Sequence, residues 1–198
     1  MSVSLEPSVY IVESLRFEDE SARRLEGRIL KSILKLSDKK AVYTYIRTRK
    51  ELKAVLRRFT EAEMRYLHIS CHGSQDSIQL TLDSIPFEEF GRIVKPHLTD
   101  RRRLFFSACE VVNENLARAV MGNSCCWSII GPDLPVTFGD AALMWASFYH
   151  LVFRENPDGM NREQIKSALE RIHQAFSVRF KYFTHCDQPP FFERVRIP

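Results

Sequence analysis

The sequence predicts a single α/β domain built on a doubly wound, mainly parallel sheet of about six strands, with helices on both faces. Short apolar segments alternate with amphipathic ones along most of the 198 residues. The strand-like segments are almost continuously apolar, as strands covered by helices on both faces require. No repeat, low-complexity block or linker interrupts this pattern, so residues 1–198 are expected to form one domain.

Six segments are predicted strands, because they are short, apolar and rich in β-branched and aromatic residues. In chain order they are Ser8–Ser14, Ala41–Thr48, Tyr66–His72, Arg103–Cys109, Cys125–Ile130 and Tyr182–His185. Most of the segments between them have helical periodicity, and a helix that joins two parallel strands crosses over with a right hand. The simplest topology is therefore a parallel sheet covered on both faces.

Amphipathic periodicity predicts the helices. They cover Glu18–Leu36, Lys50–Phe59, Pro86–Val94, Asn113–Met121, Val136–Phe153 and Arg162–Arg179. In the first of them, Leu25, Ile29, Ile33 and Leu36 recur at three- and four-residue spacing. We expect this stripe to face the core, since charged residues occupy the other side of the helix.

Two polar segments do not fit the alternation. Residues 74–84 follow the third predicted strand and contain the short alternating piece Ile78–Leu82. We expect a small hairpin or flap there, in a position where loops commonly contribute to function. The tail Gln188–Pro198, which contains two adjacent prolines, is expected to be irregular.

Composition and charge argue against several classes of protein. Basic residues (29) only slightly outnumber acidic ones (25), and the net charge of +4 is spread along the chain, so no nucleic-acid partner is expected. No apolar run approaches the roughly 18 residues of a membrane span, so no membrane association is expected. The N-terminus lacks the basic start and apolar stretch of a signal peptide. Five cysteines without a Cys-x-x-Cys pair then indicate free thiols and a cytoplasmic location.

Two of the predicted strands end on chemically capable side chains. The apolar segment Tyr66–Cys71 ends at His72, followed by Gly73, and the segment Leu104–Ala108 ends at Cys109. If both are parallel strands of one sheet, they deliver an imidazole and a thiol to the edge where open α/β sheets place their ligand sites. An imidazole can take the proton of a thiol or stabilise the thiolate. The pair is therefore a candidate for nucleophilic catalysis by cysteine.

Acyl transfer also needs hydrogen-bond donors aimed at the developing oxyanion. The backbone N–H groups of Gly73 and Cys109 are the expected donors. Asp76 and Glu110 flank the proposed site and are candidates for binding a basic side chain of the substrate or for orienting His72. A carboxylate in such a position is more often simply a solvated loop residue.

These residues also have purely structural interpretations. A cysteine at the end of a buried strand is commonly a small core residue. Cys71 is expected in the core, because strand alternation points it away from His72, and His68 is expected to be a packed histidine in mid-strand. Structural zinc sites have short paired ligands, and the spacing of the cysteines and histidines provides none, so neither a metal nor a cofactor is expected.

The pair His72-Gly73 and the downstream Ser107-Ala108-Cys109, each after an apolar strand, resemble the His-Gly and Ala-Cys signature of the caspase-like (clan CD) cysteine peptidases. Within that group the chain resembles the CHAT-domain peptidases, from about residue 8 to about residue 185. The segment Trp127–Pro132 and the apolar helix after it are similar to the family's fifth strand and the helix packed behind it. The resemblance implies a caspase-hemoglobinase-like fold and a thiol endopeptidase with His72 as base and Cys109 as nucleophile.

The resemblance further implies a protein or peptide substrate, a regulatory or activating partner protein, and an effector role in a bacterial defence or stress response. Two features depart from the caspases themselves. The pentapeptide Gln-Ala-Cys-x-Gly is absent, and 37 residues (109 minus 72) separate His72 from Cys109, fewer than the roughly 50 of caspases. A preference for cleavage after aspartate is therefore not expected. The alternatives are a catalytically inactive caspase-like interaction module and a small-molecule acyl hydrolase that uses the same two residues.

Overall fold

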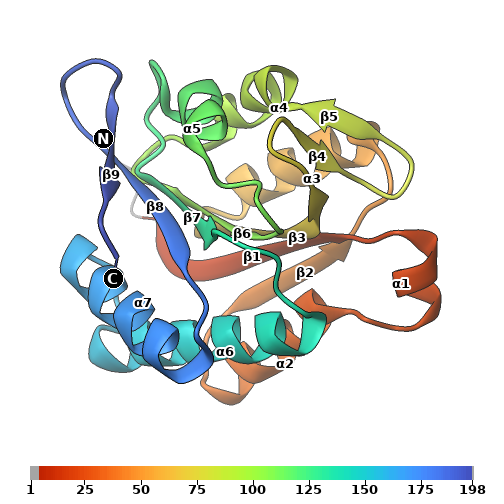
Figure 1. Cartoon of the computed structure of the whole chain (residues 1–198), viewed down its shortest axis with the longest axis horizontal. Helices are drawn as coiled ribbons and strands as arrows, with labels where there is room; N and C mark the ends of the chain where they lie inside the picture. The colour runs from red at the N-terminus through yellow and green to blue at the C-terminus, as the bar shows by residue number, and fades with distance from the viewer. Residues whose placement is uncertain (1–4, 198) are drawn as a thin grey trace.

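The computed structural model describes residues 5–197, whose strands form one sheet between two layers of helices (Figure 1). The strands are β1 (Glu6–Ser14), β2 (Ala41–Tyr45), β3 (Met64–Gly73), β4 (Ser77–Gln79), β5 (Ser84–Pro86), β6 (Arg103–Ser107), β7 (Ser128–Pro132), β8 (Phe180–His185) and β9 (Phe192–Val195). The helices are α1 (Phe17–Ser21), α2 (Glu26–Leu36), α3 (Arg49–Glu61), α4 (Phe87–Val94), α5 (Glu114–Met121), α6 (Phe138–Glu155) and α7 (Arg162–Phe176). The predicted α/β class is thus confirmed.

The order of the strands across the sheet is β2-β1-β3-β6-β7-β8-β9. The first five are parallel to one another. At one end of the sheet, β8 pairs antiparallel with β7, and β9 pairs antiparallel with β8. The short strands β4 and β5 form a hairpin attached to the end of β3, where Gly73 pairs with Ile78. This hairpin lies in and just after the polar segment that was predicted to form one.

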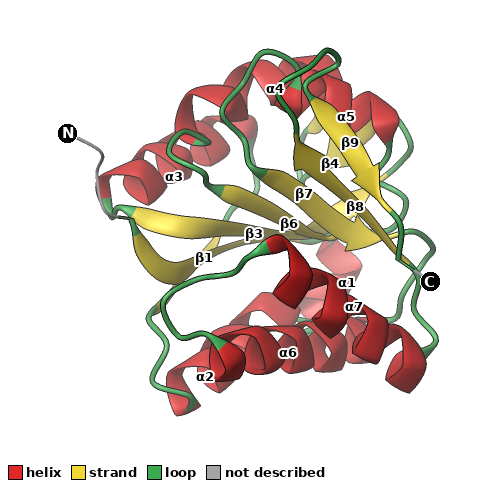
Figure 2. Cartoon of the chain, turned by 90° about the vertical axis from the view of Figure 1, so that its left-hand side faces the viewer, coloured by secondary structure: helices red, strands yellow, loops and turns green. Residues whose placement is uncertain are grey.

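Each face of the sheet has its own core, because alternate residues of a strand point to opposite faces. In β3, Leu67 and Ile69 pack with α3, α4 and α5, whereas Tyr66 packs with α2, α6 and α7. Figure 2 shows these two helix layers on either side of the sheet. Because helices connect the parallel strands, the carboxyl ends of those strands gather at one edge.

The continuous helix predicted over Glu18–Leu36 is wrong. The segment forms two helices, α1 and α2, and Arg23 in the turn between them has a φ of 55°. The residues that α2 buries are Glu26, Gly27, Leu30 and Leu34. The predicted apolar face is wrong as well, since Ile29 is 51 % exposed and Leu36 is 85 % exposed.

The close approach of α2 to β1 explains which face of the helix is buried. A Cβ atom on Gly27 would lie 2.8 Å from Cγ2 of Ile11, so the helix rests on the sheet at its glycine. The backbone N–H of Gly27 donates a hydrogen bond to the side chain of Glu13 (2.8 Å). This contact turns Leu30 and Leu34, one and two turns later, toward the sheet and leaves the predicted stripe outside.

Two smaller differences concern the second half of the chain. The strand predicted to begin at Cys125 begins at Ser128, and Cys125 itself is exposed. The tail that was predicted to be irregular contributes β9, where the ring of Phe192 packs edge-on against that of Phe183 with centroids 5.8 Å apart. Within residues 5–197, no helix is both long enough and apolar enough to cross a membrane.

Candidate active site

The carboxyl edge of the sheet brings the two predicted catalytic residues to one place. Strands β3 and β6 are parallel neighbours in which Ser70 pairs with Ser107. His72 and Cys109 each follow that pair by two residues, so both lie at the same edge. They border a common cavity of about 60 Å³. The structure therefore places the imidazole and the thiol around one small space.

The cavity is closed on its other sides by α2 and by the chain that follows β7. Its walls are formed by Glu26, Cys71, His72, Ser107, Ala108, Cys109, Pro132, Val136, Phe138 and Ala141. Since one water molecule needs roughly 10–15 Å³ of such space, the cavity has room for a few waters. A large substrate group would need a wider space than this cavity.

His72 is oriented by a carboxylate that the sequence analysis did not single out. Its Nε2 atom lies 2.8 Å from Oδ2 of Asp19, which belongs to the short helix α1. The Asp19 side chain is 11 % exposed and that of His72 is 27 % exposed. Within residues 5–197, Nδ1 of His72 makes no hydrogen bond, to Cys109 or to any other group. The Asp19 contact thus leaves Nδ1 as the nitrogen available to a thiol.

Asp19 is itself held by Arg24, whose Nη1 atom lies 2.8 Å from Oδ1. The Arg24 guanidinium lies 5.7 Å from the centre of the Phe138 ring, and that ring meets the His72 ring edge-on at 5.9 Å. These four side chains form a closed ring of contacts around the imidazole. Burial opposes ionisation of Asp19, but the hydrogen bonds from His72 and Arg24 outweigh burial and lower the pKa of Asp19. Asp19 is therefore an anion that holds the imidazole through its Nε2 atom.

A second carboxyl group, Glu26, forms the floor of the cavity. Glu26 is 3 % exposed and accepts hydrogen bonds from the hydroxyl groups of Ser107 (2.8 Å) and Ser70 (3.3 Å). Burial raises the pKa of Glu26 to about 8 in spite of these hydrogen bonds. The floor of the cavity is therefore uncharged at neutral pH, in contrast to its rim.

His68 lies beneath Glu26 and is fully buried. Its Nε2 atom is 3.9 Å from Oε1 of Glu26, and its Nδ1 atom is 3.1 Å from the hydroxyl of Tyr149. Burial lowers the pKa of His68 to about 3, so the ring is neutral. The prediction of a packed core histidine at this position is confirmed.

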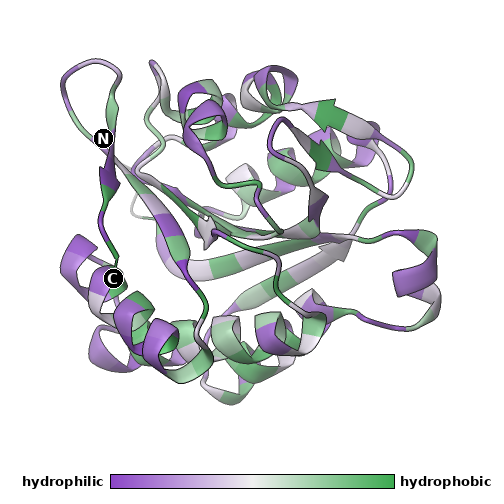
Figure 3. Cartoon of the chain, in the orientation of Figure 1, coloured by the Kyte–Doolittle hydropathy of each residue, from purple (hydrophilic) through white to green (hydrophobic). Residues whose placement is uncertain are grey.

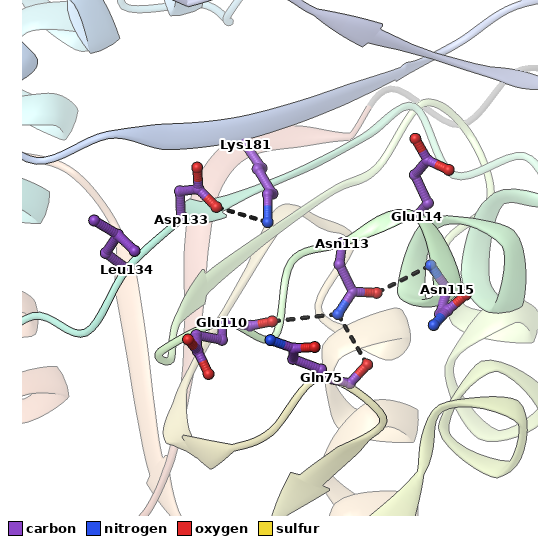
Figure 4. A pocket seen from close by; sticks show the side chains of 8 residues that line it. All are labelled: Gln75, Glu110, Asn113, Glu114, Asn115, Asp133, Leu134 and Lys181. Carbon is purple, nitrogen blue, oxygen red and sulfur yellow. Dashed lines mark hydrogen bonds and ion pairs between the residues drawn. The ribbon is translucent and has the colours of Figure 1, made fainter.

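A single side chain, Asn113, ties the loop after β6 to the loop after β3 (Figure 4). Its Nδ2 atom donates to the backbone oxygens of Gln75 (3.0 Å) and Glu110 (3.2 Å). Its Oδ1 atom accepts hydrogen bonds from two backbone N–H groups in the first turn of α5, at 2.9 and 3.1 Å. Glu110 has a left-handed φ of 59° directly after Cys109. Asn113 thus fixes the sharp turn that presents the thiol.

A larger, polar cleft of about 500 Å³ lies beside this turn (Figure 4). Its lining residues are Gln75, Glu110, Asn113, Glu114, Asn115, Asp133, Leu134 and Lys181. Asp133 is paired with Lys181 at 2.6 Å, whereas Glu110 and Glu114 have no cationic partner within residues 5–197. Because Glu110 adjoins Cys109, the cleft offers space for a substrate group next to the thiol, in the usual size range of ligand pockets.

The other predicted site residues are placed as follows. A Cβ atom on Gly73 would lie 2.3 Å from Cγ2 of Val111, so this glycine permits the close packing of the two loops. Asp76 bonds to the Ser74 hydroxyl in the turn before β4. Within residues 5–197, Asp76 forms no hydrogen bond or salt bridge with His72, and Asp19 occupies the position of an orienting carboxylate.

Asp19 and Glu26 were not predicted, because both fall in a segment that the sequence presents as one continuous helix. A signal for Asp19 does exist in its position. It follows the first strand, and the ends of parallel strands share one edge of the sheet. Nothing in the sequence distinguishes Glu26 from the exposed acidic residues of other helices.

Comparison with known proteins shows a likeness of structure. No protein-family model and no curated protein sequence matches the chain. The chain is similar to a secreted C11 cysteine protease of Bacteroides thetaiotaomicron, iotapain, with a TM-score of 0.56 and 12 % identity over 92 % of this chain and 67 % of that one. It is also similar to caspase-1 of Spodoptera frugiperda, with a TM-score of 0.56 and 11 % identity over 99 % of this chain and 87 % of that one. The chain therefore has a caspase-like fold, and its chemistry has to be argued from the site.

Proposed function

We propose that the chain is a cysteine endopeptidase in which Cys109 is the nucleophile and His72 is the base. One observation supports this most directly: a thiol and an imidazole held by a carboxylate border the same cavity at the carboxyl edge of the sheet. A nucleophile, a base and a group that orients the base are the parts from which such sites are built on unrelated folds.

In the proposed mechanism, Asp19 determines which nitrogen of His72 reacts. Because Nε2–H donates to Asp19, the lone pair is on Nδ1, which takes the proton of the Cys109 thiol. The thiolate attacks the carbonyl carbon of the scissile bond, and the backbone N–H groups of Gly73 and Cys109 donate to the resulting oxyanion. The protonated imidazole then gives its proton to the leaving amine. Water hydrolyses the thioester, with His72 again as the base.

The polar cleft beside Glu110 is the proposed binding site for the substrate chain. Lys181 neutralises Asp133, but Glu110 and Glu114 remain unpaired there, so the cleft favours a substrate with a basic side chain near the scissile bond. Glu110 is the substrate-binding residue that the cleft supports best. Asp76, whose side chain bonds to Ser74, is a weaker candidate.

Within the caspase-like group, we propose the CHAT-domain type, because the resemblance extends from about residue 8 to about residue 185 and includes the polar flap after Gly73 and the segment Trp127–Pro132. All five cysteines are free thiols, which agrees with a cytoplasmic protein. The cavity between His72 and Cys109, with a volume of about 60 Å³, is narrow for a substrate residue. We therefore propose that a regulatory partner opens the rim before cleavage, as an effector of defence or stress would require.

A peptide-library cleavage screen tests the proposal. Wild type is expected to cut a subset of peptides, whereas Cys109→Ala and His72→Ala lose cleavage by at least about 1,000-fold with unchanged circular dichroism. Cys125→Ala is the matched control, because it removes an exposed thiol away from the site, and it should cut like wild type.

Thiol labelling separates the alternatives. Iodoacetamide should modify Cys109 faster than the more exposed Cys125, because an imidazole activates the former. Cleavage of no peptide by wild type, together with slower labelling at Cys109 than at Cys125, would favour a catalytically inactive interaction module. Turnover of small esters or amides without proteolysis would favour an acyl hydrolase instead.

A further inference from the structure

We propose that the outer surface of the layer formed by α2, α6 and α7 is a docking site for an acidic amphipathic helix of a partner protein. In Figure 2 these three helices lie side by side under the sheet, and α6 runs between the other two. Their outer surface points away from the sheet. The inference does not depend on catalysis at Cys109.

A groove on this surface has an apolar floor. Its volume is about 770 Å³, and its apolar lining includes Ile33, Ala146, Leu151, Ile172 and Phe176. A second hollow of about 270 Å³ shares Ile33, Ala146 and His150 with the first. The two hollows are therefore parts of one groove along α6.

Exposed apolar side chains extend this groove along two helices. On α2, Ile29, Ile33 and Leu36 follow one another at spacings of four and three residues, so they share one face. Ile29 and Leu36 are 51 % and 85 % exposed, and Leu143, one turn before Ala146 on α6, is 57 % exposed. Figure 3 shows hydrophobic residues along the ribbon of α6.

A solvent-facing helix surface ordinarily has polar residues outside and apolar ones inside. In α2 the core contacts are made by Leu30 and Leu34, and Ile33 packs at the margin of the core. The exposed side chains of Ile29 and Leu36 are therefore not needed for the fold. Contiguous exposed apolar surface of this kind marks interaction sites in soluble proteins.

The charge around the groove determines the chemistry of the partner. The basic side chains and histidine that line the two hollows are Lys39, His150, Arg154 and Arg171, with no carboxylate among the lining residues of the described chain. Arg154 and Arg171 are exposed and form no salt bridge within residues 5–197. Acidic side chains flanking an apolar stripe would complement this rim.

The shape of the groove favours a helix. The groove lies between α-helices, where the ridge of a further helix packs well, and helices with apolar anchors at i, i+3, i+4 and i+7 bind such grooves. From Leu143 to Arg154, α6 extends roughly 17 Å, which accommodates about three turns of a partner helix.

A displayed library of amphipathic helices tests this proposal with the whole chain. The peptides have a fixed leucine stripe, and their flanking positions are drawn equally from Glu, Gln and Lys. Selection on wild type is expected to enrich Glu. In fluorescence anisotropy, a selected peptide should bind the double variant Arg154→Glu/Arg171→Glu about tenfold more weakly than wild type. Ser147→Trp, which fills the groove, should also lose binding.

The matched control is the double variant Arg57→Glu/Arg92→Glu, at another basic hollow that also contains Glu89 and His97. It should bind the peptide like wild type. Because all the substituted side chains lie at the surface, thermal unfolding should show that every variant is folded. The proposal is overturned if selection yields no helical binders, if Lys or Gln is enriched as often as Glu, or if wild type binds phosphatidylserine vesicles and not the peptides.

Discussion

The cavity between His72 and Cys109 has one charged and one uncharged carboxyl group beside it. Asp19, at the rim next to His72, is charged, and Glu26, on the floor, is uncharged. Asp19 at the rim lies near the molecular surface and Glu26 at the floor lies deep inside, although both have little exposed area, at 8 % and 3 % residue exposure. Burial acts on both, but the hydrogen bonds from His72 and Arg24 lower the pKa of Asp19, whereas burial with serine partners raises the pKa of Glu26 to about 8. The partner, and not burial alone, therefore decides the charge. Titratable groups pushed apart in this way are typical of sites that do proton chemistry.

Replacing Glu26 with glutamine should have the largest effect, on the pH dependence of stability. The pKa of Glu26 rises from 4.5 to about 8 on folding. Its contribution to stability is therefore fully present below pH 4.5 and is lost as the pH rises through 8. At 1.36 kcal/mol per pKa unit, the loss is at most about 5 kcal/mol. Urea unfolding of wild type and Glu26→Gln at a series of pH values should show wild type losing stability relative to the variant over this range.

His68 defines where this measurement is clearest. Its pKa falls from 6.5 to about 3 on folding, so the stability contribution of His68 is lost as the pH drops below 6.5, in the opposite direction to that of Glu26. Between pH 6.5 and 8, Glu26 is the titrating member of the pair. Glu163→Gln, an exposed residue in the first turn of α7, is the matched control and should leave the wild-type slope unchanged. If the free energy of unfolding changes with pH in the same way for wild type and Glu26→Gln, Glu26 is not protonated in the folded protein at neutral pH.

Replacing Asp19 with asparagine tests the rim. The substitution removes the anion that orients the His72 ring through Nε2, and it should lower kcat by about 100-fold, or about 2.7 kcal/mol in the barrier. The KM value should change by less than about threefold, because Asp19 acts through His72 and not on the substrate. Steady-state kinetics on a peptide cut by wild type measures both quantities.

Glu18→Gln is the control for this prediction, since Glu18 is exposed on the same short helix. It should keep wild-type kinetics, and Asp19→Glu should restore part of the activity lost in Asp19→Asn. If Asp19→Asn keeps its kcat, His72 does not need the carboxylate. If KM rises while kcat stays constant, Asp19 contributes to substrate binding instead.

The sequence predicts the positions of His72 and Cys109 better than those of the two carboxyl groups around them, Asp19 and Glu26. Strand periodicity and the parallel crossover rule are sufficient to place His72 and Cys109 at one edge, because they depend on local patterns and chain connectivity. The rim was missed because Asp19 lies on α1, just before a break between two helices that the periodicity of the sequence does not reveal. The close packing of Gly27 against Ile11 shows that α2 is a separate helix and that it buries a different face from the predicted one.

The floor was missed for a different reason. Glutamate at a helix start is normally solvated, and the burial of Glu26 depends on Ser70 and Ser107, which are 44 and 81 residues away in the chain. The same rotation of α2 exposes the stripe that contains Ile29 and Leu36. Long-range packing of one helix thus determines both the protonated floor and the apolar groove.

Substitution of Asn113 should have the smallest and most selective effect, because its Oδ1 atom caps α5 whereas its Nδ2 atom joins the two loops. Asn113→Asp keeps the Oδ acceptor that caps α5 but loses the donor to Gln75 and Glu110. The new carboxylate oxygen faces these two backbone oxygens and repels them, so the turn at Cys109 should loosen and activity should fall about fivefold while the cap of α5 is kept. Asn113→Ala loses the cap as well, and should also lose about 1 kcal/mol of stability. Asn161→Asp, at the capping asparagine of α7, is the matched control and should keep full activity. Equal activity in wild type and Asn113→Asp would mean that the link between the two loops does not position the thiol.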